Sequence, residues 1–175
     1  MEFKILNENE KSIFCDEIFS MLKAADEEFV PPLSSRGSTT QKNLSGSEKS
    51  EAGIRKYFEE MMKQHIMVAL EDKNLLAFVS YKENYTNEEI GTEYLPNIYL
   101  STLVSKPESR GKGLTKKMYA ALFNEYETRN ICTRTWSTNA PHIKILDYFG
   151  FETLCTLKNH RGEEIDTTYF IKKRM

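Results

Sequence analysis

The sequence has few cysteines and prolines, a single tryptophan and no long apolar run. Its 3 cysteines, Cys15, Cys132 and Cys155, stand apart from one another and never have the CxxC spacing of a metal site, so we expect no bound metal. Their odd number suits a reducing compartment, and their apolar neighbours indicate small core residues rather than nucleophiles. No apolar stretch reaches membrane-spanning length, and no signal-peptide pattern opens the chain. We therefore expect a cytoplasmic protein with no membrane partner.

An excess of one sign of charge is also missing. The 24 Lys and Arg residues against 26 Asp and Glu residues give a formal net charge of −2, so the chain lacks the basic excess of a nucleic-acid-binding domain. One basic stretch, Arg110 to Lys117, is not interleaved with the exposed aromatic side chains that single-stranded RNA requires, and we expect no nucleic-acid partner. The length of 175 residues suits one hydrophobic core, which predicts a single domain over residues 1–175.

Hydrophobic periodicity predicts a mixture of strands and helices. The expected order is strand, two helices, three strands, helix, strand, helix and two strands. In residue numbers these are a strand at 1–6, a helix at 10–25, a helix that follows a capping box at Ser45–Glu48 and ends at His65, strands at 66–71, 75–82 and 98–104, a helix from 114 to about 129, a strand at 131–138, a short helix before Gly150, and strands at 151–158 and 165–172 joined by a turn at 160–162. Residues 31–50 read as a long loop, either a substrate lid or a mobile segment.

One stretch indicates a binding site for phosphate. The apolar strand at 98–104 is followed by a break at Pro107, then by Arg110-Gly111-Lys112-Gly113, and at once by a helical pattern. Such a turn directs backbone N–H groups outward at the positive end of the helix dipole, and glycine permits close approach. Arg110 and Lys112 add positive charge, and Thr115 adds a hydroxyl donor. The alternative is a tight turn in which the glycines only permit the geometry.

The segment from Leu103 to Leu114 resembles the acyl-CoA pyrophosphate loop of the GNAT superfamily of N-acetyltransferases. The family pattern is Gln/Arg-x-x-Gly-x-Gly/Ala, and Glu108 departs from it at the first place. Asn139 and the later Gly150-Phe151 pair are similar to the second conserved segment of the family. The resemblance implies an α+β fold, with a mostly antiparallel seven-stranded sheet that splays between its fourth and fifth strands and is flanked by about four helices.

The resemblance also implies acetyl-CoA as the cofactor, held at the opening of the sheet. The implied pyrophosphate site is Arg110, Gly111, Lys112, Gly113, Leu114 and Thr115. The pantetheine arm would pair with backbone groups of Leu103 and Val104 in the manner of an added strand. Asn139 would bond that arm from the other side, or cap the following helix, or do both. His142 would lie near the sulfur of the thioester.

The implied reaction is direct transfer of the acetyl group to a primary amine of a small molecule or peptide. An alkyl amine has a pKa of about 10.4, so its neutral form costs on the order of 4 to 5 kcal/mol near pH 7, and a base matters more than an acid. Glu93 is the candidate base nearest in sequence to the fourth strand. Leu146 stands where the family usually has the tyrosine that acts as the general acid, which leaves His142 and Tyr148 as candidate acids.

Asp26, Glu27 and Glu28 border the loop that in this family faces the acceptor. Glu28 is a candidate for binding an amine, and acidic residues in this region mildly favour a cationic substrate. Arg36 would clamp a carboxylate on the substrate, or would be a solvated charge. The missing acid and base favour a second function, a non-catalytic module of the same fold that binds CoA or an acyl-CoA. Either a monomer or a homodimer is compatible with the resemblance.

Overall fold

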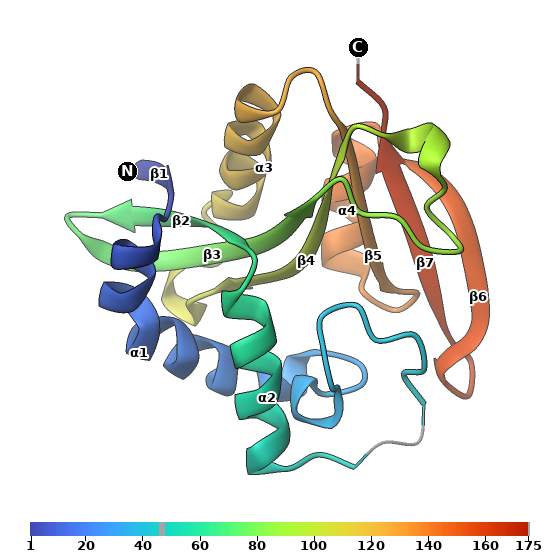
Figure 1. The fold of residues 1–175 in the computed structure, drawn as a ribbon, viewed down its shortest axis with the longest axis horizontal. Helices are drawn as coiled ribbons and strands as arrows, with labels where there is room; N and C mark the ends of the chain where they lie inside the picture. Colours follow the sequence, from blue (N-terminus) through green and yellow to red (C-terminus); the bar gives the residue numbers. More distant parts are fainter. Residues whose placement is uncertain (46–47, 175) are drawn as a thin grey trace.

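A seven-stranded sheet forms the centre of the fold (Figure 1), and the computed structural model describes residues 1–45 and 48–174. The strands are β1 (Glu2–Ile5), β2 (His65–Glu71), β3 (Asn74–Glu83), β4 (Asn97–Ser105), β5 (Asn130–Trp136), β6 (Glu152–Gly162) and β7 (Ile165–Lys172). The α-helices are α1 (Glu8–Ala24), α2 (Glu51–Met62), α3 (Leu114–Glu125) and α4 (Ala140–Tyr148). The strand order is β1-β2-β3-β4-β5-β7-β6. The expected order of elements and the α+β class are confirmed.

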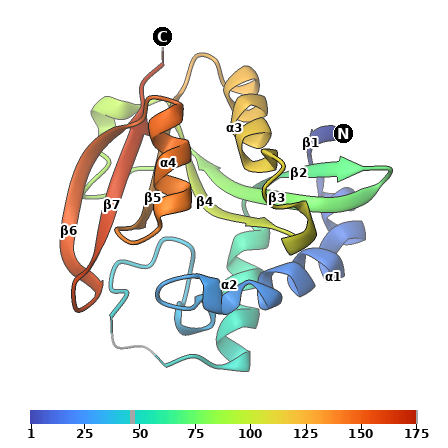
Figure 2. The same ribbon diagram turned by 180° about the vertical axis from the view of Figure 1, so that it is seen from behind.

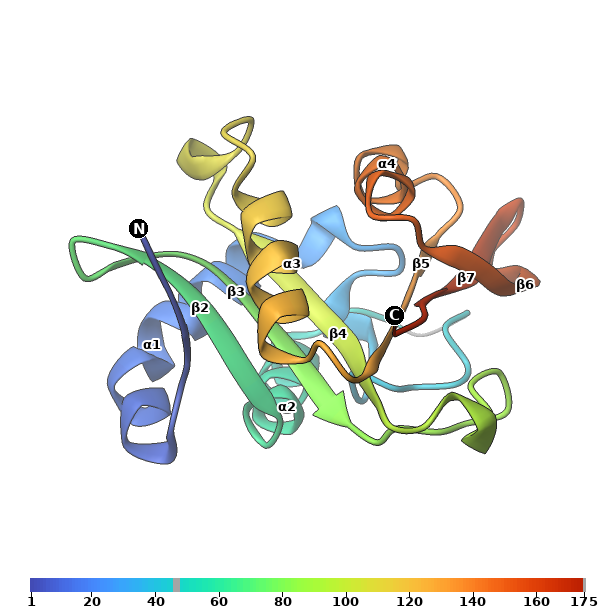
Figure 3. The ribbon, with the colours of Figure 1, turned by 90° about the horizontal axis from the view of Figure 1, so that it is seen from above.

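Helices cover both faces of the sheet. Seen from above, α3 and α4 lie on one face and α1 and α2 on the other (Figure 3), and from behind α4 lies in front of β5 (Figure 2). Because side chains alternate along a strand, neighbouring residues serve different cores. Val68 and Phe78 pack in the cluster beneath α1 and α2, whereas Met67 and Val79 pack in the cluster beneath α3 and α4.

The sheet opens between β4 and β5. These two strands are its one parallel pair, and their pairing runs only from Asn97 opposite Asn130 to Leu100 opposite Thr133. Beyond Leu100, β4 continues beside β3 alone and β5 continues beside β7 alone. The expected splay between the fourth and fifth strands is therefore confirmed, and it leaves one edge of β4 without a neighbouring strand.

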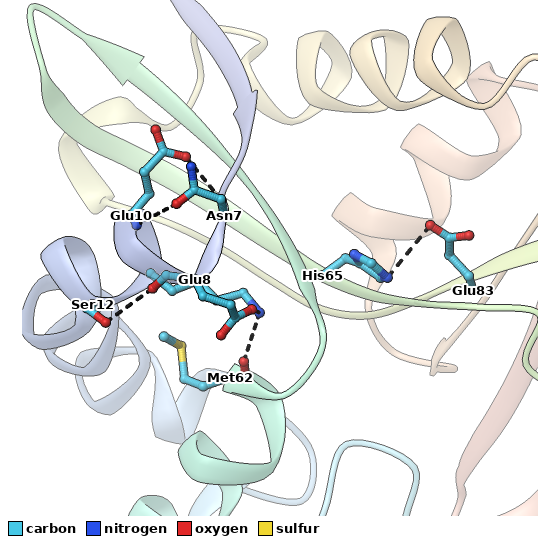
Figure 4. Close-up of polar contacts among 8 residues, drawn as sticks. Asn7, Glu8, Glu10, Ser12, Met62, His65 and Glu83 are labelled. Carbon is cyan, nitrogen blue, oxygen red and sulfur yellow. Dashed lines mark hydrogen bonds and ion pairs between the residues drawn. The ribbon is translucent and has the colours of Figure 1, made fainter.

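The first helix begins at a capping box. The Asn7 side chain accepts a hydrogen bond from the Glu10 backbone N–H, and the Glu10 carboxylate accepts one from the Asn7 N–H (Figure 4), both at 3.0 Å. The capping box expected at Ser45–Glu48 is wrong, because α2 begins after Ser50, whose hydroxyl accepts from the Gly53 N–H at 2.9 Å. The Ser50 N–H donates to the Ser34 carbonyl, and a Cβ at Gly53 would collide with that same oxygen. The contact with Ser34 therefore decides where α2 starts.

Three other predicted boundaries are wrong. His65 is not the end of α2 but the first residue of β2, where it faces Glu83 of β3 at 3.7 Å (Figure 4). The helix α3 ends at Glu125, because Tyr126 leaves the helical conformation and bonds the Tyr81 hydroxyl at 2.7 Å. The expected turn at 160–162 lies inside β6, and the hairpin instead turns at 163–164.

The part of the chain that the structure describes contains no helix with the length and apolar character needed to cross a bilayer.

Candidate functional site

A cavity of about 530 Å³ lies where β4 and β5 separate. Its walls come from residues 100–105 of β4, residues 133–136 of β5, the first turns of α3 and α4, and the segment after α1 that includes Phe29 and Arg36. The cavity is therefore built from segments that are far apart in the sequence, and it opens along the free edge of β4.

The glycine turn faces this cavity. Gly111 and Gly113 have φ values of +72° and +73°, which side-chain-bearing residues rarely adopt. A Cβ built on either glycine meets no protein atom within 4 Å, so the space in front of both is open. Gly113 is the N-cap of α3, and its carbonyl accepts the first helical bond from Lys117. The N–H groups of the first turn of α3, at Leu114 and Thr115, have no intrahelical acceptor and suit an anion.

The cations around the turn are placed unequally. Arg110 lines the cavity, where its Nη2 donates to the Ser105 carbonyl at 3.1 Å and to Glu28 at 2.9 Å. Lys116 also lines the cavity, and its Nζ lies 3.6 Å from the centre of the Tyr148 ring. Lys112 is exposed and is not part of the cavity wall. Of these two lysines, Lys116 is therefore the one in the cavity wall.

The register of β4 decides which of its backbone groups face the opening. The Lys106 N–H donates to the Leu76 carbonyl, and Val104 lies opposite Phe78. Because alternate residues of an antiparallel strand bond the same neighbour, Val104 directs its N–H and C=O towards β3. Leu103 directs its N–H and C=O towards the opening between β4 and β5. Only one member of the expected Leu103–Val104 pair therefore offers backbone groups to a ligand arm, and Val104 contributes a wall.

The first turn of α4 closes the cavity next to α3. Asn139 caps the helix, because its Oδ1 accepts from the His142 N–H at 3.4 Å while its Nδ2 donates to Thr135 Oγ1 at 2.9 Å. The half-buried His142 pairs through Nε2 with the Tyr119 hydroxyl at 2.7 Å. Burial lowers the pKa of His142 to about 4, so its imidazole is neutral near pH 7, and burial raises the pKa of Tyr119. His142 therefore reaches the cavity as an uncharged group.

The structure does not bring the predicted catalytic residues together. Glu93 lies on an exposed 3-10 turn (Thr92–Tyr94) and is not part of the cavity wall. Tyr148 is 66% exposed at the surface of α4, where it contacts Lys116 outside the cavity. Of these three candidates, only His142 lines the cavity. The helical rotation between Leu146 and Tyr148 explains this, because Leu146 points into the core and Tyr148 points away from it.

The acceptor-side residues also differ from expectation. Glu28 is the one acidic residue in the described cavity wall, and it is paired with Arg110. Arg36 is buried, so the solvated interpretation is wrong, and its Nε and Nη2 donate to the Pro31 carbonyl at 3.0 and 2.7 Å.

Two further arginines in the cavity wall were missed by reasoning from the sequence. Arg134 interrupts the otherwise buried strand β5, and Arg161 lies in β6 where a turn was expected. A charged residue inside a β-branched, buried strand is the one local signal that marks Arg134. We call Arg36, Arg134 and Arg161 the arginine cluster.

Comparisons with known proteins agree with this architecture. Among solved structures, a ribosomal-protein-alanine N-acetyltransferase from Brucella melitensis is 16% identical, with a TM-score of 0.66 over 99% of each chain. A putative acetyltransferase from Salmonella typhimurium, solved with its cofactor acetyl-CoA, is 15% identical, with a TM-score of 0.66 over 99% of this chain and 93% of that one. An aminoglycoside 6'-acetyltransferase type Ii is 15% identical, with a TM-score of 0.67 over 99% and 97% of the two chains. At these identities the likeness concerns the fold alone.

The sequence itself identifies the family. A comparison with curated protein sequences gives no significant match. The family model described as Acetyltransferase (GNAT) family matches residues 27–151, which include the glycine turn, the free edge of β4 and the first turn of α4. The chain belongs to the GNAT family of acetyltransferases.

Proposed function

We propose that this chain is an acetyl-CoA-dependent N-acetyltransferase that acts on a primary amine of a small molecule or peptide. The observation that carries the proposal is the pair of left-handed glycines, Gly111 and Gly113, which open onto a cavity along the free edge of β4. A cradle that protein atoms leave empty, at the N-terminus of a twelve-residue helix, fits a diphosphate.

The residues present fit coenzyme A along the whole opening. The N–H groups of Leu114 and Thr115 and the charges of Arg110 and Lys116 would hold the pyrophosphate. The backbone N–H and C=O of Leu103 would bond the pantetheine amides as a neighbouring strand does. Asn139 fixes the start of α4, and its amide keeps one N–H and one lone pair that would bond the pantetheine arm as well.

The proton balance of the transfer constrains what the protein must supply. Acetyl transfer breaks the thioester C–S bond, forms a C–N bond and yields the free thiol of CoA, and an amine that enters as ammonium releases one further proton. No unpaired carboxylate lines the described cavity to accept that proton. His142 lines the cavity, but burial lowers its pKa to about 4 and its Nε2 already contacts Tyr119, so its imidazole is too weak a base to keep this proton. We assign the proton to water in the cavity.

A non-catalytic CoA-binding module of the same fold is the second candidate. The specific observation that favours it is the ion pair that engages Glu28, the one acidic side chain of the described cavity wall. A single assay separates the two functions: release of free thiol from acetyl-CoA, measured over a panel of anionic, neutral and cationic amines. A transferase releases thiol only when an acceptor amine is present. Binding of CoA without thiol release on any amine would reject the enzyme and leave the binding module.

A further inference from the structure

The arginine cluster concentrates positive charge in the cavity without an acidic partner. Arg36 and Arg161 are each 6% exposed, and Arg134 is half-buried. In residues 1–45 and 48–174 the arginine ion pairs are Arg110 with Glu28 and Arg129 with Glu83, and the cluster forms none. Three guanidinium groups therefore converge on one cavity with no carboxylate bound to them.

Neutral oxygens hold the two most buried members in place. Arg36 donates to the Pro31 carbonyl, as described above. Arg161 donates from Nη1 to the Val30 carbonyl at 2.6 Å and from Nε to Thr167 Oγ1 at 2.8 Å. Since a guanidinium group has five N–H donors, three donors on each side chain find no acceptor among the described protein atoms. These donors belong to side chains that line the cavity.

The third member is held in the same way. Arg134 donates from Nη2 to the Gln41 carbonyl at 2.8 Å and from Nη1 to the Tyr169 hydroxyl at 3.2 Å. The Gln41 carbonyl belongs to the segment after α1, so this segment is fixed across the cavity by contacts to both β5 and β6. The long loop is thus an ordered wall of the cavity in its described residues.

The three groups are neighbours around one aromatic pair. Phe29 and Trp136 lie with ring centres 5.8 Å apart. The guanidinium carbon of Arg36 lies 5.7 Å from the centre of Phe29, and that of Arg161 lies 5.7 Å from the centre of Trp136. Arg134 is two residues before Trp136 on β5, so both side chains leave the same face of the strand. The cluster is therefore a single positive site.

This site lies across the sheet from the glycine turn. Thr135 bonds Asn139 of α4, so it faces the side of the sheet that α3 and α4 cover. Arg134 and Trp136 alternate with Thr135 and face the opposite side. A diphosphate at α3 and a ligand at the cluster would therefore approach the opening between β4 and β5 from opposite faces.

The free N–H groups of the cluster are accessible from the cavity, because no buried side-chain nitrogen of the described residues lacks a hydrogen-bond partner, and they are therefore available to a ligand. Burial, together with the charges of Arg36 and Arg134, lowers the pKa of Arg161 to about 9. Burial likewise lowers the pKa of Arg36. Carbonyl oxygens and aromatic rings orient these groups but do not neutralise them, and a carboxylate would do both through paired N–H bonds.

We propose that the acceptor is an amine that also carries carboxylate groups, of the class of the dicarboxylic amino acids, and that Arg36, Arg134 and Arg161 bind its carboxylates. Two carboxylates balance the three guanidinium groups once the negative charge of Asp26, which acts on Arg36 and is held in place by Ser34, is counted. A polycationic amine would meet like charge, so the mild expectation of a cationic substrate is reversed. The identity of the acceptor rests on the proposed function, whereas the anion site does not.

The first test measures the anion site without any reaction. Trp136 is the single tryptophan of the chain and lines the cavity, so its fluorescence reports the site directly. We expect glutarate to cause a saturable change and 1,5-diaminopentane at equal ionic strength to cause none. Arg36→Met and Arg161→Met should each weaken glutarate binding at least about tenfold, because each removes charged hydrogen bonds.

A matched control is available outside the cavity. Arg55 also packs over an aromatic ring, with its guanidinium carbon 4.9 Å from the centre of Phe19. Arg55→Met should leave glutarate binding unchanged. Equal binding of the diamine, absence of any glutarate response, or unchanged affinity in both cluster variants would overturn the anion site. If a cluster variant does not fold, the comparison of glutarate with the diamine on the natural chain still decides.

The second test identifies the acceptor by thiol release from acetyl-CoA. Glutamate and aspartate should be acetylated at least tenfold faster than their diamides, spermidine or 2-aminoethylphosphonate. Thiol release with spermidine but not with the acidic amines would overturn the inference and keep the transferase. Glutarate binding with no thiol release on any amine would keep the anion site and reject the transferase. A preference for the phosphonate would reject the carboxylate class.

Discussion

Alanine at Gly113 should weaken CoA binding far more than it weakens the fold. Gly113 caps α3 at a φ of +73°, and an added Cβ would meet no protein atom within 4 Å. In the free protein the methyl group therefore costs only the strain of a left-handed alanine, about 1 to 2 kcal/mol. For a chain of this length that strain lowers Tm by roughly 2 to 8 °C.

The cost to binding is larger because the methyl group would enter the space proposed for the diphosphate. Loss of one or more charged hydrogen bonds from the first turn of α3 costs about 1.5 to 3 kcal/mol, or about ten- to hundredfold in the Kd for CoA. Gly111, with a φ of +72° and equally open space, should respond in the same way.

Gly150 supplies the matched control. It has a φ of +72° and no protein atom within 4 Å of a Cβ, but it follows α4 and lies outside the cavity wall. Gly150→Ala should lower Tm as Gly113→Ala does and leave the Kd for CoA unchanged. Calorimetric titration with CoA and thermal unfolding of the three variants measure both effects. Equal CoA affinity in Gly113→Ala and Gly150→Ala would refute the placement of the diphosphate.

Three further predictions concern other parts of the cavity and core. Arg110→Gln should weaken CoA binding about tenfold, because it removes a charge from the proposed diphosphate site. Glu28→Gln should tighten CoA binding slightly, because Glu28 competes for Arg110 in the free protein. The affinity for CoA should fall less steeply with salt concentration in Arg110→Gln than in the natural chain. His142 has a folded-state pKa of about 4 against 6.5 in the unfolded chain. The unfolded state therefore binds more protons between these values, and the unfolding free energy falls by about 3 kcal/mol at most as the pH drops from 6.5 to 4. In urea unfolding, the free energy of His142→Gln should not show this part of the pH dependence, and a pH dependence identical to that of the natural chain would contradict the pKa. Tyr57→Phe should lower the unfolding free energy by about 1 to 2 kcal/mol, because it leaves the buried Thr102 hydroxyl, 2.7 Å from the Tyr57 oxygen, without its partner. The double variant Tyr57→Phe with Thr102→Val should recover part of this loss. No recovery in the double variant would argue against a hydrogen bond between the two hydroxyls.

The parts of this protein that the sequence predicted are those with a local cause. Two glycines between an apolar strand and an amphipathic pattern predicted the turn, and the structure gives both a positive φ. The strands at 66–71 and 75–82 were equally local, and Asp72 and Lys73 between them take up the left-handed conformation that a two-residue turn needs.

The start of α2 illustrates what local pattern leaves open. Ser45 and Ser50 both suit an N-cap, and the capping box favoured Ser45. The choice falls on Ser50 because the Ser34 carbonyl, from a distant segment, accepts its N–H and packs against Gly53. No periodicity within the helix contains that contact.

The arginine cluster as a whole could not be predicted from the sequence for the same reason. Arg36, Arg134 and Arg161 come from a loop, from β5 and from β6, and of the three only Arg36 was a candidate from the sequence. Arg161 reaches the cavity only because β6 pairs with β7 as far as Gly162, which places its Nε against Thr167. The candidates Glu93 and Tyr148 fail in the opposite way, since nearness in sequence to the site did not bring them into the cavity wall.

A backbone amide NMR titration with CoA tests the central claim most directly. The amide resonances of Gly111, Gly113, Leu114 and Thr115 should shift together and saturate with the calorimetric Kd, with a further shift at Leu103, while that of Gly150 stays in place. CoA that binds and shifts other amides, but leaves the first turn of α3 unmoved, would contradict the account.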